Sequence, residues 1–318
     1  MKKLLSVALF SVLATAHAET VYVTLEKDNA LAIVDPVEAK LLKTAKVGQR
    51  PRGIALSPDH KFLFVATSDD NTIKMLDAQS LKVIAKLPSG EDPETFAVSP
   101  QGDKLYVSNE DDSMVTVIDI AKKKAIEKIK VGVEPEGITV SPDNQWVASA
   151  SETTNMVHWI DTKTHKIVEN TLVDPRPRAL SFTADTQQLW VTSEMAGTLQ
   201  VIDTKTKQII KAIKLSVEGV TDDKIQPVGV LIDKDRKRGY VALGTANRVA
   251  VINAQTLEVE KMLLVGSRVW NLAFSPDEKR LYTTNGTSND ISIVDLESQT
   301  VTKSVTVGTY PWGVAVKP

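Results

Sequence analysis

The sequence predicts an all-β fold made of one repeated unit, and three observations support this prediction. The motif "RPRGIALSPD" at residues 50–59 returns in altered form as "DPETFAVSPQ" at 92 and "EPEGITVSPD" at 134. Its first proline aligns at steps of 42, 42, 42, 50, 42 and 42 residues, at Pro51, Pro93, Pro135, Pro177, Pro227, Val269 and Pro311. Two further columns keep the same phase: an aromatic one that begins with Tyr22, and one of Asp or Asn that begins with Asp35.

Each unit contains four short runs that read as strands. In the first complete unit these runs are "GIALS", "KFLFVAT", "TIKMLD" and "KVIAKL", which are rich in apolar and β-branched residues and separated by polar turns. Four strands in about 40 to 45 residues is the spacing of a propeller blade. Six complete units begin at residues 51, 93, 135, 177, 227 and 269.

The two ends of the chain supply a seventh unit. Residues 311–318 contain a first strand, "WGVAV", and residues 19–50 contain strands two to four. We therefore expect a seven-bladed β-propeller with four antiparallel strands per blade and one blade shared between the N- and C-termini. Such closure leaves no free sheet edge at the seam.

The N-terminus predicts export. "MKK", an apolar stretch and "AHA" read as a signal peptide, residues 1–18, that is cleaved after Ala18. We expect residues 19–318 to form a single propeller domain, located in the periplasm and without a membrane span after cleavage. Cleavage removes two lysines and no acid from a chain of formal charge −2, so the mature chain carries −4. This balance argues against nucleic acid as a partner.

The sequence contains no cysteine, which excludes disulfides, thiolate zinc sites and haem attachment through CxxCH. It also lacks HExxH, GxSxG, Walker A and GxGxxG motifs. His158 lies within a strand and reads as a core residue. We therefore predict no catalytic residues, no metal ligands and no cofactor.

The residues that flank the first proline of each unit are candidates for a ligand site. The first strand of each blade lines the axis, so these links between blades surround the channel mouth. The candidate residues are Arg50, Arg52, Asp92, Glu94, Glu134, Glu136, Arg176, Arg178, Arg268, Trp270, Tyr310 and Trp312. Charges and aromatic rings at a concave mouth suit a small charged ligand. A belt of salt bridges between blades, such as Arg52–Glu94 and Glu136–Arg178, explains the same charges without a ligand.

The turns between strands two and three share the face of the channel mouth, because strand directions alternate. These turns are acidic, while lysines such as Lys40, Lys82 and Lys122 lie on the opposite face. The acids that we interpret as a partner-docking rim are Asp69, Asp70, Glu110, Asp111, Asp112, Glu152 and Glu194. A solvated surface explains the pattern equally. The step of 50 places eight extra residues in the link 215–227 on this face, as a lid or as a neutral loop.

Short motifs resemble a known family. "YVTL" at 22, "YVSN" at 106 and "YTTN" at 282 resemble the repeat of YVTN-type seven-bladed propellers. The segments "SETTNMVHWID", "RVWNLAFSPDEK", "TNGTSNDISIVD" and "GTYPWGVAVKP" are more similar to the PQQ-dependent catabolism-associated propeller proteins. The resemblance covers the mature chain and implies a periplasmic protein that accompanies quinoprotein alcohol oxidation. The tryptophan-docking repeats of quinoprotein dehydrogenases are missing, so we expect no bound PQQ.

Two functional hypotheses follow. The first is a periplasmic, non-catalytic binding or docking module whose partner is a cationic protein of an electron-transfer system. The second is a hydrolase of the propeller-lactonase type with its site at the channel mouth. It would use Glu136 as the base and Arg178 or Arg52 to stabilise an oxyanion.

Overall fold

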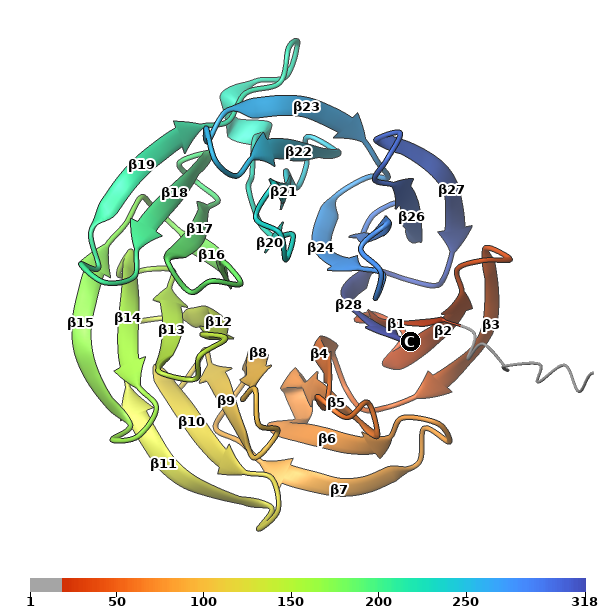
Figure 1. The fold of residues 1–318 in the computed structure, drawn as a ribbon. Coiled ribbons are helices and arrows are strands. Elements are labelled where there is room, and N and C mark those ends of the chain that lie inside the picture. Colours follow the sequence, from red (N-terminus) through yellow and green to blue (C-terminus); the bar gives the residue numbers. More distant parts are fainter. Residues whose placement is uncertain (1–18) are drawn as a thin grey trace, which may run out of the picture.

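The computed structural model describes residues 19–318 as a ring of seven four-stranded sheets around a central axis (Figure 1). All pairs of neighbouring strands within a sheet are antiparallel, so the predicted fold class is confirmed. The predicted signal peptide, residues 1–18, lies outside the described residues. Among the described residues, no helix is long and apolar enough to cross a membrane.

We number the blades from the shared one and give the strands from the axis outwards. Blades 1 to 3 comprise β28 (Pro311–Lys317), β1 (Thr20–Leu25), β2 (Ala30–Asp35) and β3 (Lys40–Lys46); β4 (Pro51–Leu56), β5 (Phe62–Thr67), β6 (Thr72–Asp77) and β7 (Val83–Pro88); and β8 (Pro93–Val98), β9 (Lys104–Asn109), β10 (Met114–Asp119) and β11 (Lys124–Lys130). Blades 4 and 5 comprise β12 (Pro135–Val140), β13 (Trp146–Ser151), β14 (Met156–Asp161) and β15 (Lys166–Leu172); and β16 (Pro177–Phe182), β17 (Gln188–Ser193), β18 (Thr198–Asp203) and β19 (Ile209–Lys214). Blades 6 and 7 comprise β20 (Val230–Ile232), β21 (Arg238–Ala242), β22 (Arg248–Asn253) and β23 (Val259–Leu264); and β24 (Val269–Phe274), β25 (Arg280–Asn285), β26 (Asp290–Asp295) and β27 (Thr300–Thr306).

The two ends of the described chain close the ring. β28 pairs with β1, with Tyr22 opposite Ala315 and Val23 opposite Val314, so the C-terminal strand is the innermost strand of blade 1. The prediction of a shared blade is therefore confirmed. Pairing of the terminal strands leaves neither of them as a free edge.

Hydrophobic residues pack between neighbouring blades. Phe64 of blade 2 and Phe96 of blade 3 meet edge to face, with ring centroids 6.4 Å apart. The aromatic column has one exception, Ala148, and its cross-strand neighbour Trp159 fills the space, fully buried. The core therefore lies between the sheets.

The Asp and Asn column fixes turns, as its position at the end of each third strand predicts. Asp77 accepts the backbone N–H of Ser80 at 2.7 Å, and Asn253 accepts that of Thr256 at 3.0 Å. Asp and Asn share this turn chemistry, which explains why either residue occurs in the column. These side chains are structural and lie away from the channel mouth.

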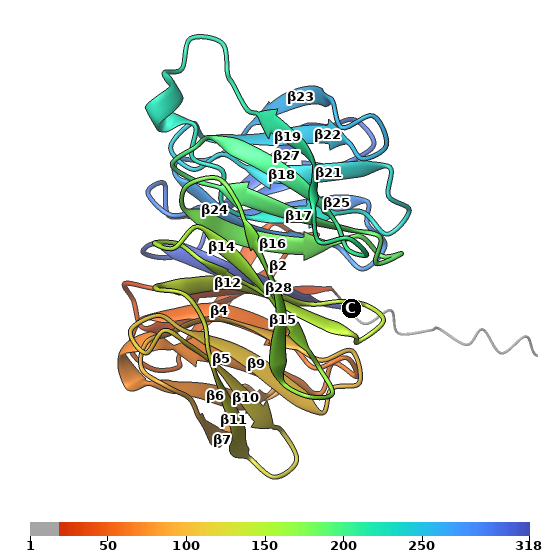
Figure 2. The same ribbon diagram turned by 90° about the vertical axis from the view of Figure 1, so that its left-hand side faces the viewer.

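The extra residues between β19 and β20 project from the face of the channel mouth (Figure 2). They contain the short 3₁₀ helix η2 (Asp222–Lys224); a second one, η1 (Ser68–Asp70), forms the β5–β6 turn. Figure 1 shows the tip of the insertion pointing outwards, away from the axis. Ile225 is buried against the neighbouring core and anchors its end.

Candidate functional site

The corner between blades presents the proline-flanking residues to the channel. In every blade except blade 6, the residue before the proline, or before Val269 in blade 7, adopts left-handed backbone, with φ of 43° at Asp92 and 57° at Arg268. An asparagine from the preceding blade accepts its N–H: Asn71 accepts from Asp92 at 3.0 Å, and Asn247 accepts from Arg268 at 2.8 Å. The same bond is made by Asn29, Asn155 and Asn289. The sequence analysis missed this role, although an Asn recurs at this place in five of the seven turns between strands two and three.

The residue after the proline lies in a β-bulge. Pairing of β4 with β5 passes from Pro51↔Thr67 to Ile54↔Val65, so one residue more lies on the inner strand. The same shift occurs in β8, β12, β16 and β24. A bulge re-aims side chains, and here it turns Arg52 and its equivalents towards the axis.

These side chains surround a mouth cavity of about 570 Å³. Its lining contains Arg50, Arg52, Glu110, Glu136, Arg176, Arg178, Glu194, Met195, Asp223, Gln226, Arg268 and Trp270. Asp92 and Glu94 join this group through ion pairs with Arg50. Tyr310 packs against Trp270, with ring centroids 6.2 Å apart.

The first ion-pair cluster joins blades 1, 2 and 3. Arg50 Nη1 lies 2.8 Å from Asp92 Oδ1, and its Nη2 lies 2.8 Å from Glu94 Oε1. Arg52 also pairs with Glu94, whose side chain has no exposed surface. The Nε atom of Arg52 lies 3.6 Å from Glu26 Oε2. Glu26 is a member of this cluster that the sequence analysis did not include among the site residues.

The second cluster joins blades 4 and 5. Arg178 Nη1 lies 2.6 Å from Glu136 Oε2 and also pairs with Glu152. Arg176 lies 3.0 Å from Glu152 Oε2 and 3.1 Å from Glu194 Oε2. Burial of Glu152, together with the hydrogen bond to Glu136 and the negative charge of Glu136, raises the pKa of Glu152 to about 9. Glu136 is buried too, but the positive charge of Arg178 lowers the pKa of Glu136 despite this burial. At neutral pH these shifts favour a protonated Glu152 beside an ionised Glu136.

An acidic arc connects the two clusters, and we define it as Asp92 and Glu94 of the first cluster, Glu110 and Glu134, and Glu136 of the second cluster. Carboxylate oxygens of Asp92, Glu94 and Glu110 lie within 4.8 Å of one another. Burial, and then the charges of Glu136 and Asp92, raise the pKa of Glu110. Arg50 already pairs with Asp92 and Glu94, and an acidic cluster alone does not define a metal site.

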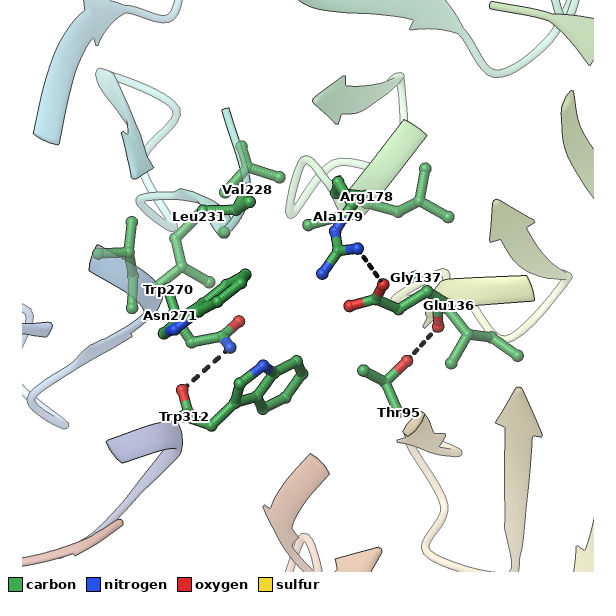
Figure 3. A pocket seen from close by; sticks show the side chains of 15 residues that line it. Thr95, Glu136, Gly137, Arg178, Ala179, Val228, Leu231, Trp270, Asn271 and Trp312 are labelled. Carbon is green, nitrogen blue, oxygen red and sulfur yellow. Dashed lines mark hydrogen bonds and ion pairs between the residues drawn. The ribbon is translucent and has the colours of Figure 1, made fainter. Parts of the chain in front are cut away.

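Beneath the mouth lies a smaller cavity of about 170 Å³, the channel chamber (Figure 3). Its wall is formed by first-strand residues of blades 1 and 3 to 7, among them Trp270, Asn271 and Trp312. Glu136, Arg178 and Trp270 line both cavities. The chamber therefore continues the mouth along the axis.

Only part of the predicted docking rim is free on the surface. Glu152 and Glu194 are buried, with 3% and 8% of their surface exposed, because they pair with Arg176 and Arg178. The other acids divide into three groups. Asp70 and Asp112 accept hydrogen bonds from the backbone N–H groups of Gln49 and Glu91 and so hold the links between blades in place. Glu110 is half-buried at the channel mouth. Asp69 and Asp111 are exposed. Interpreting Glu152 and Glu194 as surface residues was wrong, because a turn position alone does not give the direction of its side chain.

The geometry does not favour Glu136 as a catalytic base. Its carboxylate is held by Arg178, whose guanidinium also pairs with Glu152 and so is already occupied. His158 accepts the N–H of Gly132 at Nε2 and faces Asn170 at Nδ1, and burial lowers its pKa. It is therefore a neutral core residue, as predicted.

Fold and site together define a β-propeller repeat protein with an ion-paired channel mouth. A family described as YNCE-like beta-propeller matches residues 6–145. A family described as choice-of-anchor I domain matches residues 111–273, just over half of the chain, so the chain belongs to that family. Among curated proteins, none matches the chain.

Solved structures show the same fold. Hydrazine synthase of Kuenenia stuttgartiensis is 22% identical with a TM-score of 0.75, and the match covers 83% of this chain and 89% of that one. A putative 6-phosphogluconolactonase of Bacteroides uniformis is 14% identical with a TM-score of 0.80, covering 95% and 100%. Dihydro-heme d1 dehydrogenase NirN in complex with DHE is 17% identical with a TM-score of 0.67, covering 90% and 63%. At these identities the likeness shows the fold alone.

Proposed function

We propose that the protein is a periplasmic, non-catalytic propeller that docks a cationic protein on its channel-mouth face, as an accessory of quinoprotein (PQQ-dependent) alcohol oxidation. The docking proposal rests on the environment of Glu110. Its equivalents in blades 1 and 4, Glu26 and Glu152, lie against arginine side chains of the following blade. In the blade that follows Glu110, the same positions hold Glu134 and Glu136.

A partner's lysine or arginine side chain would complete the ring at this place. The mouth cavity of about 570 Å³ gives such a side chain room, and Glu110 lines it. Asp69, whose side chain is 59% exposed, and Asp111 lie at the outer edge of the same face and add negative potential. Surface charges of this kind increase the association rate of an oppositely charged protein.

The docking test measures association with cytochrome c, a basic soluble electron carrier, at 10 mM and 150 mM salt. The Debye length falls from about 30 Å to about 8 Å over this range, so binding should weaken sharply. Glu110→Gln should weaken binding at low salt, and so should the pair Asp69→Asn and Asp111→Asn. The matched control is Glu38→Gln, an exposed acid in the β2–β3 turn on the opposite face. Binding that ignores salt and is equal in all variants would reject this face as the dock.

A small organic cation is a second candidate occupant, because the acidic arc and the mouth cavity suit an ammonium group as well. Spermidine serves as the probe, and a thermal shift that Glu110→Gln abolishes and Glu38→Gln keeps would support it. A shift of equal size in both variants, or none in the unaltered protein, would reject it.

The proposed role in quinoprotein alcohol oxidation rests on the resemblance of the repeats to PQQ-associated propellers. Deleting the gene should slow growth on alcohols that the quinoprotein oxidises and leave growth on succinate unchanged. Equal growth of the deletion strain and its parent on both carbon sources would separate the protein from alcohol oxidation, whatever the outcome of the docking test.

A further inference from the structure

Two side-chain groups in the wall of the channel chamber lack a hydrogen-bond partner among residues 19–318, the indole Nε1 atoms of Trp270 and Trp312. Around its wall, Thr95 donates to the backbone oxygen of Glu136, and the amide of Asn271 donates to the backbone oxygen of Trp312 at 3.0 Å (Figure 3). Glu136 and Arg178 bind each other at 2.6 Å. The two indole N–H groups, however, remain without an acceptor in the described part of the chain.

The indole of Trp312 is aimed into the chamber. Only 4% of the residue is exposed, and Figure 3 shows its nitrogen on the edge of the ring that faces the open centre of the lining residues. Arg52 covers the ring, with its guanidinium carbon 5.1 Å from the centroid. Trp270 differs: a Cβ placed on Gly286 would lie 2.6 Å from its Nε1, so that N–H points towards the β25–β26 turn. A buried donor without an acceptor costs free energy that a ligand can recover.

The rest of the wall restricts what can bind. The aliphatic side chains of Ile138, Leu180, Val230 and Leu272 make most of the lining apolar. The chamber of about 170 Å³ compares with cavities of roughly 150 Å³ that hold benzene. A charged ligand would lose its hydration beside an ion pair that is already complete, which is unfavourable.

We propose that the chamber binds a small uncharged ring-sized molecule that accepts a hydrogen bond from Trp312 Nε1, such as a cyclic ketone or an aromatic aldehyde. The molecule enters from the mouth between Arg178 and Trp270, which border both cavities. Its ring packs against the aliphatic wall, and its oxygen faces the indole. The donor Trp312 and the aliphatic wall are not part of the acidic arc, so this binding does not depend on docking of a cationic protein.

Cyclohexanone is the probe, because it is unreactive and matches the chamber in size. Saturation-transfer NMR with the unaltered protein compares it with cyclohexane, which lacks the acceptor, and cyclohexanecarboxylate, which is charged, at equal sub-millimolar concentrations. We expect transfer to cyclohexanone, weaker transfer to cyclohexane and none to the carboxylate. Equal transfer to cyclohexane and cyclohexanone, or none to cyclohexanone, would overturn the proposal.

The variant Trp312→Phe keeps most of the ring and removes the N–H. A titration should show the Kd of cyclohexanone raised by about three- to tenfold, the usual range for one neutral hydrogen bond. Trp146→Phe is the matched control, since Trp146 lies outside the chamber, and its Kd should equal that of the unaltered protein. An unchanged Kd in Trp312→Phe would overturn the assignment of the donor, and the ligand series decides even where the variant does not fold.

Discussion

At the scale of single residues, Arg178 is the centre of the second ion-pair cluster. Its guanidinium pairs with Glu136 and Glu152, and only 8% of its side chain is exposed. Arg178→Met leaves the buried Glu136 carboxylate without its ion-pair partner, which typically costs about 3 to 5 kcal/mol of unfolding free energy. Urea denaturation at pH 7 measures this loss. Arg248→Met is the control, with an expected loss below about 1 kcal/mol, because the Arg248 guanidinium bonds only to backbone oxygens. Equal losses in both variants would contradict the central role of Arg178.

Glu152 makes the stability of the mouth depend on pH. Burial and the neighbouring Glu136 raise its pKa from 4.5 to about 9, so the folded protein keeps a proton that the unfolded chain has lost. Its contribution to the free energy of unfolding is complete below about pH 4.5 and disappears as the pH rises through about 9. Glu152→Gln should reduce this decline, because an amide donates to Glu136 without titrating.

The measurement for Glu152 is the urea midpoint at pH 5, 7 and 9. Between pH 5 and pH 9 the unaltered protein should lose more stability than Glu152→Gln. Glu38→Gln, on the exposed β2–β3 turn, should follow the unaltered protein. Parallel curves for Glu152→Gln and the unaltered protein would show that the carboxyl group does not hold the proton.

At the scale of elements, the inner strands approach one another closely after each bulge. A Cβ on Gly137 would lie 2.2 Å from the backbone oxygen of Arg178, and one on Gly313 would lie 2.4 Å from that of Arg52. Gly137→Ala therefore forces β12 and β16 apart, and we expect it to cost about 1 to 3 kcal/mol, as overpacking does. Gly219→Asn in the exposed insertion should change stability by less than about 0.5 kcal/mol, because nothing lies within 4 Å and Asn tolerates its φ of +75°. Denaturant midpoints of the two variants provide the measurement, and a neutral Gly137→Ala would show that the inner strands have room to move.

The elements were predictable from the sequence where local chemistry repeats. Alternating apolar residues and the turn side chains at Asp77 and Asn253 recur in every unit and need only their own blade, so the strands appeared in the correct phase. Pairing between blades was predictable only for neighbours at equivalent positions, such as Arg52 with Glu94. Arg268 reaches Glu194 across blade 6, where the insertion shortens the inner strand β20, and no periodic pattern contains that contact.

The direction of the side chains in the turns is a second feature that the sequence did not predict. Glu152 is the first residue of its turn and Asp69 is the second, and Glu152 is buried while the side chain of Asp69 is 59% exposed. In every blade the first residue of this turn is buried or half-buried and the second is exposed, and this alternation belongs to the folded turn, which the repeat of the acids alone did not show. The insertion was not predictable either, because its outward course depends on how Ile225 packs between blades 5 and 6.

At the scale of the whole molecule, the eight C-terminal residues close the ring. β28 supplies the inner strand of blade 1 and pairs with β1 from Thr20↔Lys317 to Leu25↔Pro311. A chain that ends at Tyr310 exposes the inner edge of β1 and removes Trp312 and Val314 from the cores on both sides. We expect this truncated chain to lose its cooperative unfolding transition, measured by circular dichroism against urea. A truncated chain that unfolds at the midpoint of the full one would show that closure adds nothing.

A circular permutant separates the loss of the strand from the loss of the chain end. Thr20 and Lys317 are paired, so a short Gly-Ser linker from Pro318 to Glu19 turns β28 and β1 into a continuous hairpin. The linker must leave the Glu19 side chain free, because it binds Tyr282 at 2.6 Å and pairs with Arg280. New termini between Gly219 and Val220 lie at the exposed tip of the insertion, where chain breaks are tolerated. The permutant keeps every strand, so it should retain the cooperative transition that the chain ending at Tyr310 loses. Loss of the transition in both would mean that the order of the chain, and not the completed blade, holds the ring together.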